Sequence, residues 1–225
     1  MVERTRRNSD GRAVLAAVLA LGVIAAGAGC TLPIGTAESL RLRELLAIEP
    51  GMVVADVGAG KGGWTLEMSR AVGPNGHVYS TEIDPKRIGE IRAAVSDAGV
   101  DNVSVIEGTP QDTGLPEGCC DAIFLRHVHH HITHPEAMHA SLRQALRPGG
   151  RLAIIDFEPF LRLLGIPEGV PENRAGHGMP LEVLLDELAS AGFELEHRID
   201  DWFRFDYCAV WTRPDMAPST RGVRR

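Results

Sequence analysis

Apolar positions along this chain change their spacing in a regular way, and the changes divide it into alternating strands and helices. Short β-branched runs recur between glycine, proline and acidic residues, and the segments between them have the three-to-four-residue spacing of a helix face. The expected strands are 53–57, 77–84, 103–106, 121–125, 151–156, 193–199 and 205–212. The expected helices are 37–48, 61–71, 85–98, a segment that closes on 146–150, and 180–191. Such an alternation predicts an α/β fold with a parallel sheet.

Three regions flank this alternation. Helix 37–48 is amphipathic and is expected to offer four leucines to the core: Leu40, Leu42, Leu45 and Leu46. Residues 158–179 are rich in glycine and proline and predict a long loop, which in a compact domain is usually functional or mobile. The last two strands are expected to form an antiparallel pair.

A glycine-rich turn follows the first strand, which ends at Asp56 and Val57. Gly58 and Gly60 let the backbone turn tightly and approach a ligand where a Cβ would clash. The spacing Gly58-x-Gly60-x-x-Gly63 also fits the dinucleotide fingerprint, whose glycines accommodate a pyrophosphate. A carboxylate at position 56 is a poor neighbour for pyrophosphate and suits a ligand with a cationic amino group. The turn by itself leaves S-adenosylmethionine and a dinucleotide both open.

Motifs further along favour the first of these ligands. The second strand carries Glu82, and an acidic side chain there can accept hydrogen bonds from the ribose hydroxyls of either cofactor. With Asp56-x-Gly58-x-Gly60, Glu82 and Leu146-x-Pro148-Gly149-Gly150 in this order, the sequence resembles the class I S-adenosylmethionine-dependent methyltransferases from about Ala37 to Arg213. The resemblance implies a Rossmann-like, doubly wound sheet of seven strands with an antiparallel last strand, and S-adenosylmethionine as the cofactor.

The resemblance also implies cofactor-binding residues: Asp56, Gly58, Gly60, Glu82, Gly108 and Thr109. Glu82 is expected on the ribose and Asp56 near the amino-acid end of the cofactor. The family usually has an aspartate directly after the glycine equivalent to Gly108, where it accepts from the adenine amino group. This chain has Thr109 there, so either its hydroxyl or Asp112 is expected to take that role.

A cluster of histidines follows the fourth strand: His127, His129, His130, His131 and His134. Ligands bind beyond the carboxyl ends of strands in open α/β sheets. The pair His130-His131, the step His134-Pro135 and the segment 108–116 resemble a poorly characterised bacterial subset of methyltransferase-like proteins, many with apparent export signals.

Methyl transfer requires the acceptor to be aligned with the methyl group, and a general base helps where the acceptor carries a proton. We expect His131 as the first candidate for this base, His130 as the second, and His177 from the long loop as the third. Histidines that only line a pocket or lie in a surface loop are the alternative. Asp156 and Glu158, at the end of the fifth strand, either face the acceptor or lie in solvent.

No metal site is predicted, because a structural zinc site would be expected to draw on cysteine with characteristic spacing. Cys119, Cys120 and Cys208 are expected to be unpaired and buried, since adjacent residues rarely bridge each other.

The first thirty residues have the layout of a secretory signal, with four arginines before the uncharged run 13–29. Cys30 is placed like the lipid-accepting cysteine of bacterial lipoproteins, although Gly27 stands where an apolar residue is usual. Cleavage after Ala28, an uncleaved membrane anchor within residues 13–30, and a helix packed on the domain are alternatives. We expect residues 31–213 to form an exported, membrane-attached domain and 214–225 a disordered tail; a cytoplasmic location is the alternative.

Composition restricts the partners. A net charge of −7 argues against a nucleic-acid binder, and 225 residues with 44% apolar content can bury one core. The predicted function is therefore transfer of a methyl group from S-adenosylmethionine to an unidentified small-molecule acceptor. Two alternatives stay open: an exported, non-catalytic binding module on the same fold, and an NAD-dependent oxidoreductase. The oligomeric state cannot be read from the sequence.

Overall fold

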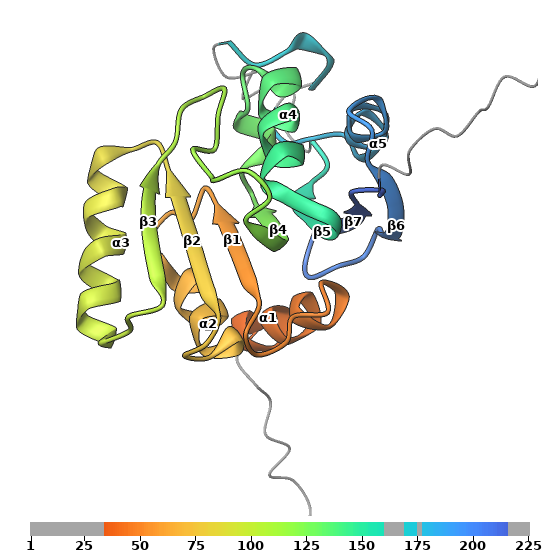
Figure 1. Cartoon of the computed structure of the whole chain (residues 1–225). Helices are drawn as coiled ribbons and strands as arrows, with labels where there is room; N and C mark the ends of the chain where they lie inside the picture. Colours follow the sequence, from red (N-terminus) through yellow and green to blue (C-terminus); the bar gives the residue numbers. More distant parts are fainter. Residues whose placement is uncertain (1–33, 160–168, 175–176, 216–225) are drawn as a thin grey trace, which may run out of the picture. The chain divides into compact units, whose positions relative to one another are not determined.

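A computed structural model describes residues 34–159, 169–174 and 177–215 (Figure 1). The predicted signal or anchor at 1–30 and most of the predicted tail at 214–225 lie outside these ranges. Within the described ranges, no helix is long and apolar enough to span a membrane.

Seven strands form one sheet with the order β3-β2-β1-β4-β5-β7-β6. The strands are β1 (Val53–Val57), β2 (His77–Glu82), β3 (Val103–Glu107), β4 (Cys120–Arg126), β5 (Leu146–Phe157), β6 (Glu194–Ile199) and β7 (Asp206–Thr212). β7 lies between β5 and β6 and is antiparallel to both, whereas the pairs among β1 to β5 are parallel. The predicted doubly wound, seven-stranded fold with an antiparallel last strand is confirmed.

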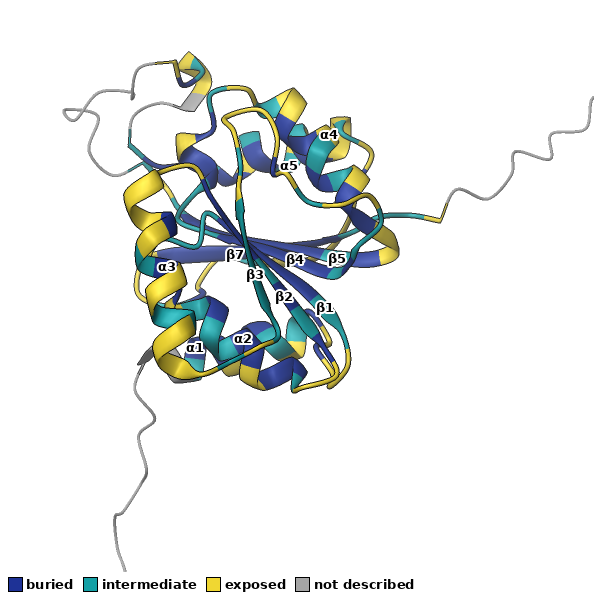
Figure 2. Ribbon diagram, turned by 60° about the vertical axis from the view of Figure 1, so that its left-hand side comes forward, coloured by how far each residue is buried: buried dark blue, intermediate teal, exposed yellow. Residues whose placement is uncertain are grey.

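Helices cover both faces of the sheet (Figure 2). They are α1 (Ile34–Leu45), α2 (Gly63–Val72), α3 (Pro85–Ala98), α4 (Pro135–Ala145) and α5 (Leu181–Ser190), with short 3-10 helices η1 (His129–His131) and η3 (Glu172–Arg174). The apolar residues of α1 and α2 pack into one core cluster and those of α4 and α5 into another. Central strands such as β1 and β4 are apolar along most of their length because they are buried on both faces.

Helix α1 begins and ends three residues before its predicted bounds. Leu42 and Leu46 are buried as expected, but Leu40 is 39% exposed, so its assignment to the core was wrong. The helix also buries the polar residues Glu38 and Ser39, and Glu38 binds Arg126 at the end of β4, which the apolar spacing alone could not show.

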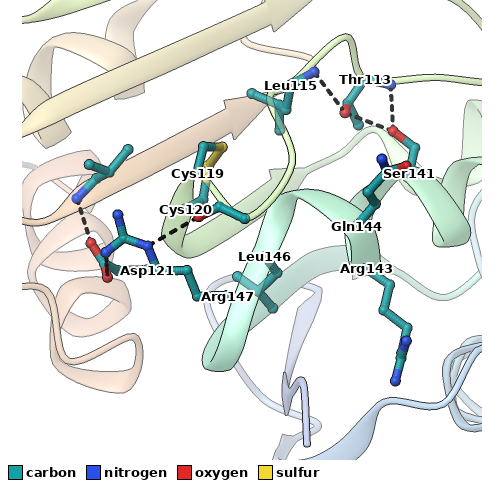
Figure 3. Close-up of a disulfide and its surroundings, with 12 residues drawn as sticks. Thr113, Leu115, Cys119, Cys120, Asp121, Ser141, Arg143, Gln144, Leu146 and Arg147 are labelled. Carbon is teal, nitrogen blue, oxygen red and sulfur yellow. Dashed lines mark hydrogen bonds and ion pairs between the residues drawn. A yellow bond between two sulfur atoms is a disulfide. The ribbon is translucent and has the colours of Figure 1, made fainter. Parts of the chain in front are cut away.

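The cysteines also differ from expectation. Cys119, directly before β4, and Cys120, its first residue, form a disulfide (Figure 3). Their Cα atoms are 3.7 Å apart, below the usual range for bonded cysteines, which is why adjacency argued against a bridge. Cys208 is unpaired and fully buried, and burial raises the pKa of its thiol to about 12, so it is not a nucleophile at neutral pH.

Candidate cofactor and acceptor site

A cavity of about 470 Å³ lies at the carboxyl ends of β1, β2 and β4. The strand order reverses between β1 and β4, and this switch point is where open α/β sheets bind ligands. The cavity is lined by six of the predicted site residues: Gly58, Gly60, Glu82, Gly108, Thr109 and His131. Asp56, His130 and His177 are predicted site residues that do not line it.

The turn from β1 to α2 forms one wall of the cavity. Gly58 and Gly60 have φ angles of 75° and 61°, in the left-handed region that favours glycine. The N–H groups of Gly58 and Ala59 both donate to the carbonyl of Thr81, which holds the turn against the end of β2. A Cβ on Gly58 would lie 2.4 Å from a methyl of Val128, whereas one on Gly60 would meet only the end of the Arg87 side chain, at 3.5 Å.

Alanine at these two glycines is therefore expected to have unequal effects. Gly58→Ala and Gly60→Ala both force a left-handed alanine, at about 1–2 kcal/mol each. Gly58→Ala adds overpacking against Val128, about 1–3 kcal/mol more. Urea unfolding of the two variants compares these losses directly. Equal losses in the two variants would contradict the close approach of Val128 to Gly58.

Glu82 joins the end of β2 to the glycine turn. One carboxylate oxygen accepts from the N–H of Gly60 at 3.0 Å, and the other accepts from the N–H of Ile83 at 2.8 Å and of Asp84 at 3.3 Å. A carboxylate has about four acceptor positions, so the oxygen facing Gly60 keeps one for a ligand hydroxyl. The carboxylate thus both shapes the turn and faces the cavity.

Asp56 lies behind the cavity wall and does not line the cavity, and its place near the amino-acid end of the cofactor stays a prediction. Its side chain is only 3% exposed and accepts a hydrogen bond from the hydroxyl of Thr65 at 2.7 Å. The same hydroxyl contacts Ser80 at 2.9 Å, so a small polar network links β1, β2 and α2. Burial raises the pKa of Asp56 to about 7; the Thr65 hydroxyl opposes this rise, and the charge of Glu82 adds to it.

This shift predicts a pH-dependent stability. The unfolded carboxyl ionises near pH 3.8 and the folded one near 7, so between these values the folded protein binds more protons. The free energy of unfolding should therefore fall as the pH rises from about 4 to 7, by about 1.4 kcal/mol for each unit of pKa shift.

The variant Asp56→Asn cannot ionise and can still accept from Thr65. Its stability relative to the native chain is expected to rise across the same pH window and to level off above pH 7. Denaturant unfolding at several pH values measures this difference. A difference that does not change with pH would show that Asp56 does not titrate in this range.

The loop after β3 holds both candidate acceptors for the adenine amino group, Thr109 and Asp112. The Thr109 hydroxyl accepts from the N–H groups of Gln111 and Asp112, and it is thereby engaged within its own turn. Asp112 lines the cavity, and one of its carboxylate oxygens accepts from Gly114 and Ser141. These two hydrogen bonds lower the pKa of Asp112, so it stays ionised and is the stronger acceptor of the two.

Three of the predicted histidines come together with Asp156. His130 is buried, and its Nδ1 lies 2.8 Å from a carboxylate oxygen of Asp156, whose other oxygen accepts the His130 N–H. The ring of His130 contacts the rings of His131 and His177, at centroid distances of 4.0 and 4.8 Å. Asp156 is fully buried, and Glu158 accepts from the N–H of Leu181 at the start of α5.

His131 is the member of this group that reaches the cavity. Partial burial of its ring lowers the pKa of His131, and the neighbouring His130 and His177 lower it further, against a smaller opposite effect of Asp156. The ring is therefore neutral near neutral pH and has a nitrogen that can accept a proton.

The structure adds two cavity residues that were not assigned a role from the sequence. Arg126, at the end of β4, binds the carboxylate of Glu38 with two nitrogens, at 2.9 and 3.1 Å. His127 has a φ of 56° and contacts Asp206 at 2.7 Å through Nε2. Arg126 is a polar residue at a strand end, a signal that could have marked it; nothing in the sequence links it to Glu38, 88 positions away.

Comparison with known proteins gives matches over much of this domain. Residues 54–150 match the methyltransferase domain family. The ubiquinone/menaquinone biosynthesis C-methyltransferase UbiE of Pseudomonas aeruginosa is 31% identical over 123 residues, which are 54% of this chain and 48% of the relative. The chain thus spans about half the length of the curated relatives it matches.

Solved structures match a larger part of the chain than these sequence relatives do. An S-adenosylmethionine-dependent methyltransferase from Aquifex aeolicus superposes with a TM-score of 0.67 at 24% identity, covering 80% of this chain and 94% of that one. The [4+2]-cyclase SpnF has a TM-score of 0.65 at 15% identity, with 78% and 80% covered. At these identities the likeness concerns the fold, and the cyclase shows that the fold is compatible with more than one chemistry.

Proposed function

We propose that this chain, which belongs to the class I S-adenosylmethionine-dependent methyltransferases, transfers the methyl group of that cofactor to a small-molecule acceptor. The observation that carries the proposal is the cavity at the switch point of the sheet. Glu82 and the glycine turn form one side of it, and His131 lies on the segment after β4 that also lines it.

The residues of this cavity fit the cofactor. A Cβ on Gly58 would meet Val128 and one on Gly60 would reach Arg87, both of which line the cavity, and the free acceptor position of Glu82 suits a ribose hydroxyl. Asp112 offers a charged acceptor for an exocyclic amino group. The volume of about 470 Å³ lies within the range of small-molecule sites.

Bound S-adenosylmethionine supplies an electrophilic methyl group, so the protein has mainly to position the acceptor and remove its proton. His131 takes that proton at its unprotonated ring nitrogen, because it lines the cavity and is held beside His130. Asp156 fixes the orientation of His130 through two hydrogen bonds, and His130 in turn supports the ring of His131. Arg126 lies at the same wall, where the carboxylates of Glu38 and Asp206 pair with its guanidinium and hold its position.

Two measurements test the proposal. Calorimetry is expected to show binding of S-adenosylhomocysteine and none of NADH. Labelled S-adenosylmethionine, incubated with the protein and a small-molecule extract, is expected to transfer label to a component of that extract. Binding of NADH without S-adenosylhomocysteine would favour an oxidoreductase, and binding of S-adenosylhomocysteine without label transfer would favour a non-catalytic module.

We also propose, from the sequence of the first thirty residues, that the domain after Cys30 is exported and attached to the membrane. Positive charge before an apolar run keeps the N-terminus in the cytoplasm and sends the following residues across. Fractionation of cells labelled with palmitate, with Cys30→Ser as the comparison, tests lipid attachment against simple cleavage. Full-length, unlabelled chain in the cytosol would rule out export.

A further inference from the structure

Two buried histidines outside the cavity have no part in the mechanism proposed above. His129, on η1, is 0% exposed, and His139, on α4, is 2% exposed. Their Nε2 atoms lie 2.8 Å apart, and their ring planes are within 11° of parallel. Since a neutral imidazole has one protonated nitrogen, one of the two Nε2 atoms donates to the other in this arrangement.

A carboxylate completes the cluster. One oxygen of Glu187, on α5, lies 4.0 Å from Nε2 of His129 and 3.9 Å from Nε2 of His139. The three atoms form a triangle whose circumcentre is about 2.1 Å from each of them, the bond length that Zn²⁺ makes to imidazole nitrogen and carboxylate oxygen. A cation at that point would be within bonding distance of all three atoms and would lie in their plane.

Solvent and cations can reach the cluster from one side. A surface cavity of about 630 Å³ is lined by His139 and Glu187 together with the carboxylate residues Glu136 and Asp186. Three acidic side chains in one concave surface raise the local concentration of cations. The cavity also leaves room for water as a further ligand. A tetrahedral site with two imidazoles, one carboxylate and water requires the ion to lie outside the plane of the three protein atoms, so a small shift of these side chains accompanies binding.

We propose that His129, His139 and Glu187 form a binding site for a divalent transition-metal ion of the Zn²⁺ type. Binding replaces the hydrogen bond between the two imidazoles by two nitrogen–metal bonds, and the Nε2 proton of the donor ring moves to Nδ1 of the same ring. The ligands come from η1, α4 and α5, so the ion ties together three elements on one face of the sheet. Because His131 belongs to the same short helix as His129, the ion also steadies the segment that lines the cofactor cavity.

Titration of the full chain with Zn²⁺ by calorimetry tests this site without any methyl acceptor. One equivalent of Zn²⁺ is expected to bind, Mg²⁺ is expected not to compete, and Zn²⁺ should raise the melting temperature. Glu187→Gln and His139→Ala are each expected to weaken binding at least about tenfold, because each removes one ligand. Glu187 is partly exposed, so its variant is expected to fold even if the loss of buried His139 unfolds the chain.

His134→Ala and His197→Ala are the matched controls, since both histidines lie outside the cluster. Both controls should bind Zn²⁺ as the native chain does. The absorption spectrum with Co²⁺ separates this site from the cysteines, because thiolate ligands give an intense near-ultraviolet band that nitrogen and oxygen ligands lack. No binding, equal weakening in the controls, or a thiolate band would overturn the proposal. Binding of S-adenosylhomocysteine is measured on the same samples, so failure of the metal site is distinguishable from failure of the methyltransferase assignment.

Discussion

Replacing Glu82 by glutamine is expected to weaken the binding of S-adenosylhomocysteine by about 10- to 100-fold. Hydrogen bonds to a charged group contribute about 1.5–3 kcal/mol, and the free acceptor position of Glu82 is the one that faces the cavity. Glutamine has the same size but turns an NH₂ group either toward the N–H of Gly60 or toward those of Ile83 and Asp84. The variant therefore either loses the acceptor that faces the cavity or shifts the glycine turn away from its native position.

Glu107→Gln is the matched control for this variant. Glu107 is paired with Glu82 in the register of β2 and β3, ends its strand in the same way, and is exposed. Glu107 does not line the cavity, so its replacement is expected to leave the affinity for S-adenosylhomocysteine unchanged. Calorimetry of both variants is the measurement. Unchanged affinity in Glu82→Gln would remove this carboxylate from the cofactor site, whereas a loss in both variants would indicate a general effect of charge.

His131→Gln is expected to lower the rate of methyl transfer by about 100-fold or more while leaving the affinity for S-adenosylhomocysteine unchanged. General-base catalysis contributes about 10²–10⁴ in rate, and glutamine cannot take a proton at neutral pH. The residue is exposed on one side, so the variant should fold. Single-turnover transfer of label to the acceptor found in the extract separates the chemical step from binding.

His134→Ala provides the comparison for this experiment. His134 belongs to the same histidine-rich segment, is exposed and lies outside the cavity wall, so its replacement is expected to have no effect on the rate. An unchanged rate in His131→Gln would exclude His131 as the base. His130→Gln would then be the next variant, although burial of His130 against Asp156 makes a loss of stability part of its expected effect.

Local sequence signals predicted elements where the causes of structure are themselves local. Helix α3 has its predicted bounds because Asp84 accepts from the N–H of Lys86, Pro85 begins the helix, and Gly99 ends it with a φ of 61°. The predicted glycine turn follows the same logic, since left-handed φ angles at Gly58 and Gly60 are properties of single residues. Helix α1 lacks such signals in its expected range, and its predicted bounds were three residues late.

The partners within the site required the folded chain. Spacing placed Asp56 at the end of β1, but the direction of its side chain depends on Thr65 in α2, and this contact puts the carboxylate behind the cavity wall. Similarly, His127 meets Asp206 across 79 positions, and Arg126 meets Glu38 across 88. Turn chemistry also separates the two candidate acceptors for the adenine amino group, since the Thr109 hydroxyl accepts only within its own loop, whereas Asp112 accepts from Gly114 and Ser141 through one oxygen and lines the cavity.

The sequence by itself determined the class of fold, the order of its elements, and the turn and acidic strand end that mark a cofactor pocket. These features depend on periodicity, caps and backbone conformations, which act over a few residues. Only the tertiary structure decided which histidine faces the cavity, which ones pair with Asp156, and that His129, His139 and Glu187 converge. Those contacts join residues that are distant in sequence. They form only after the helices have packed on the sheet and the strands have aligned in register.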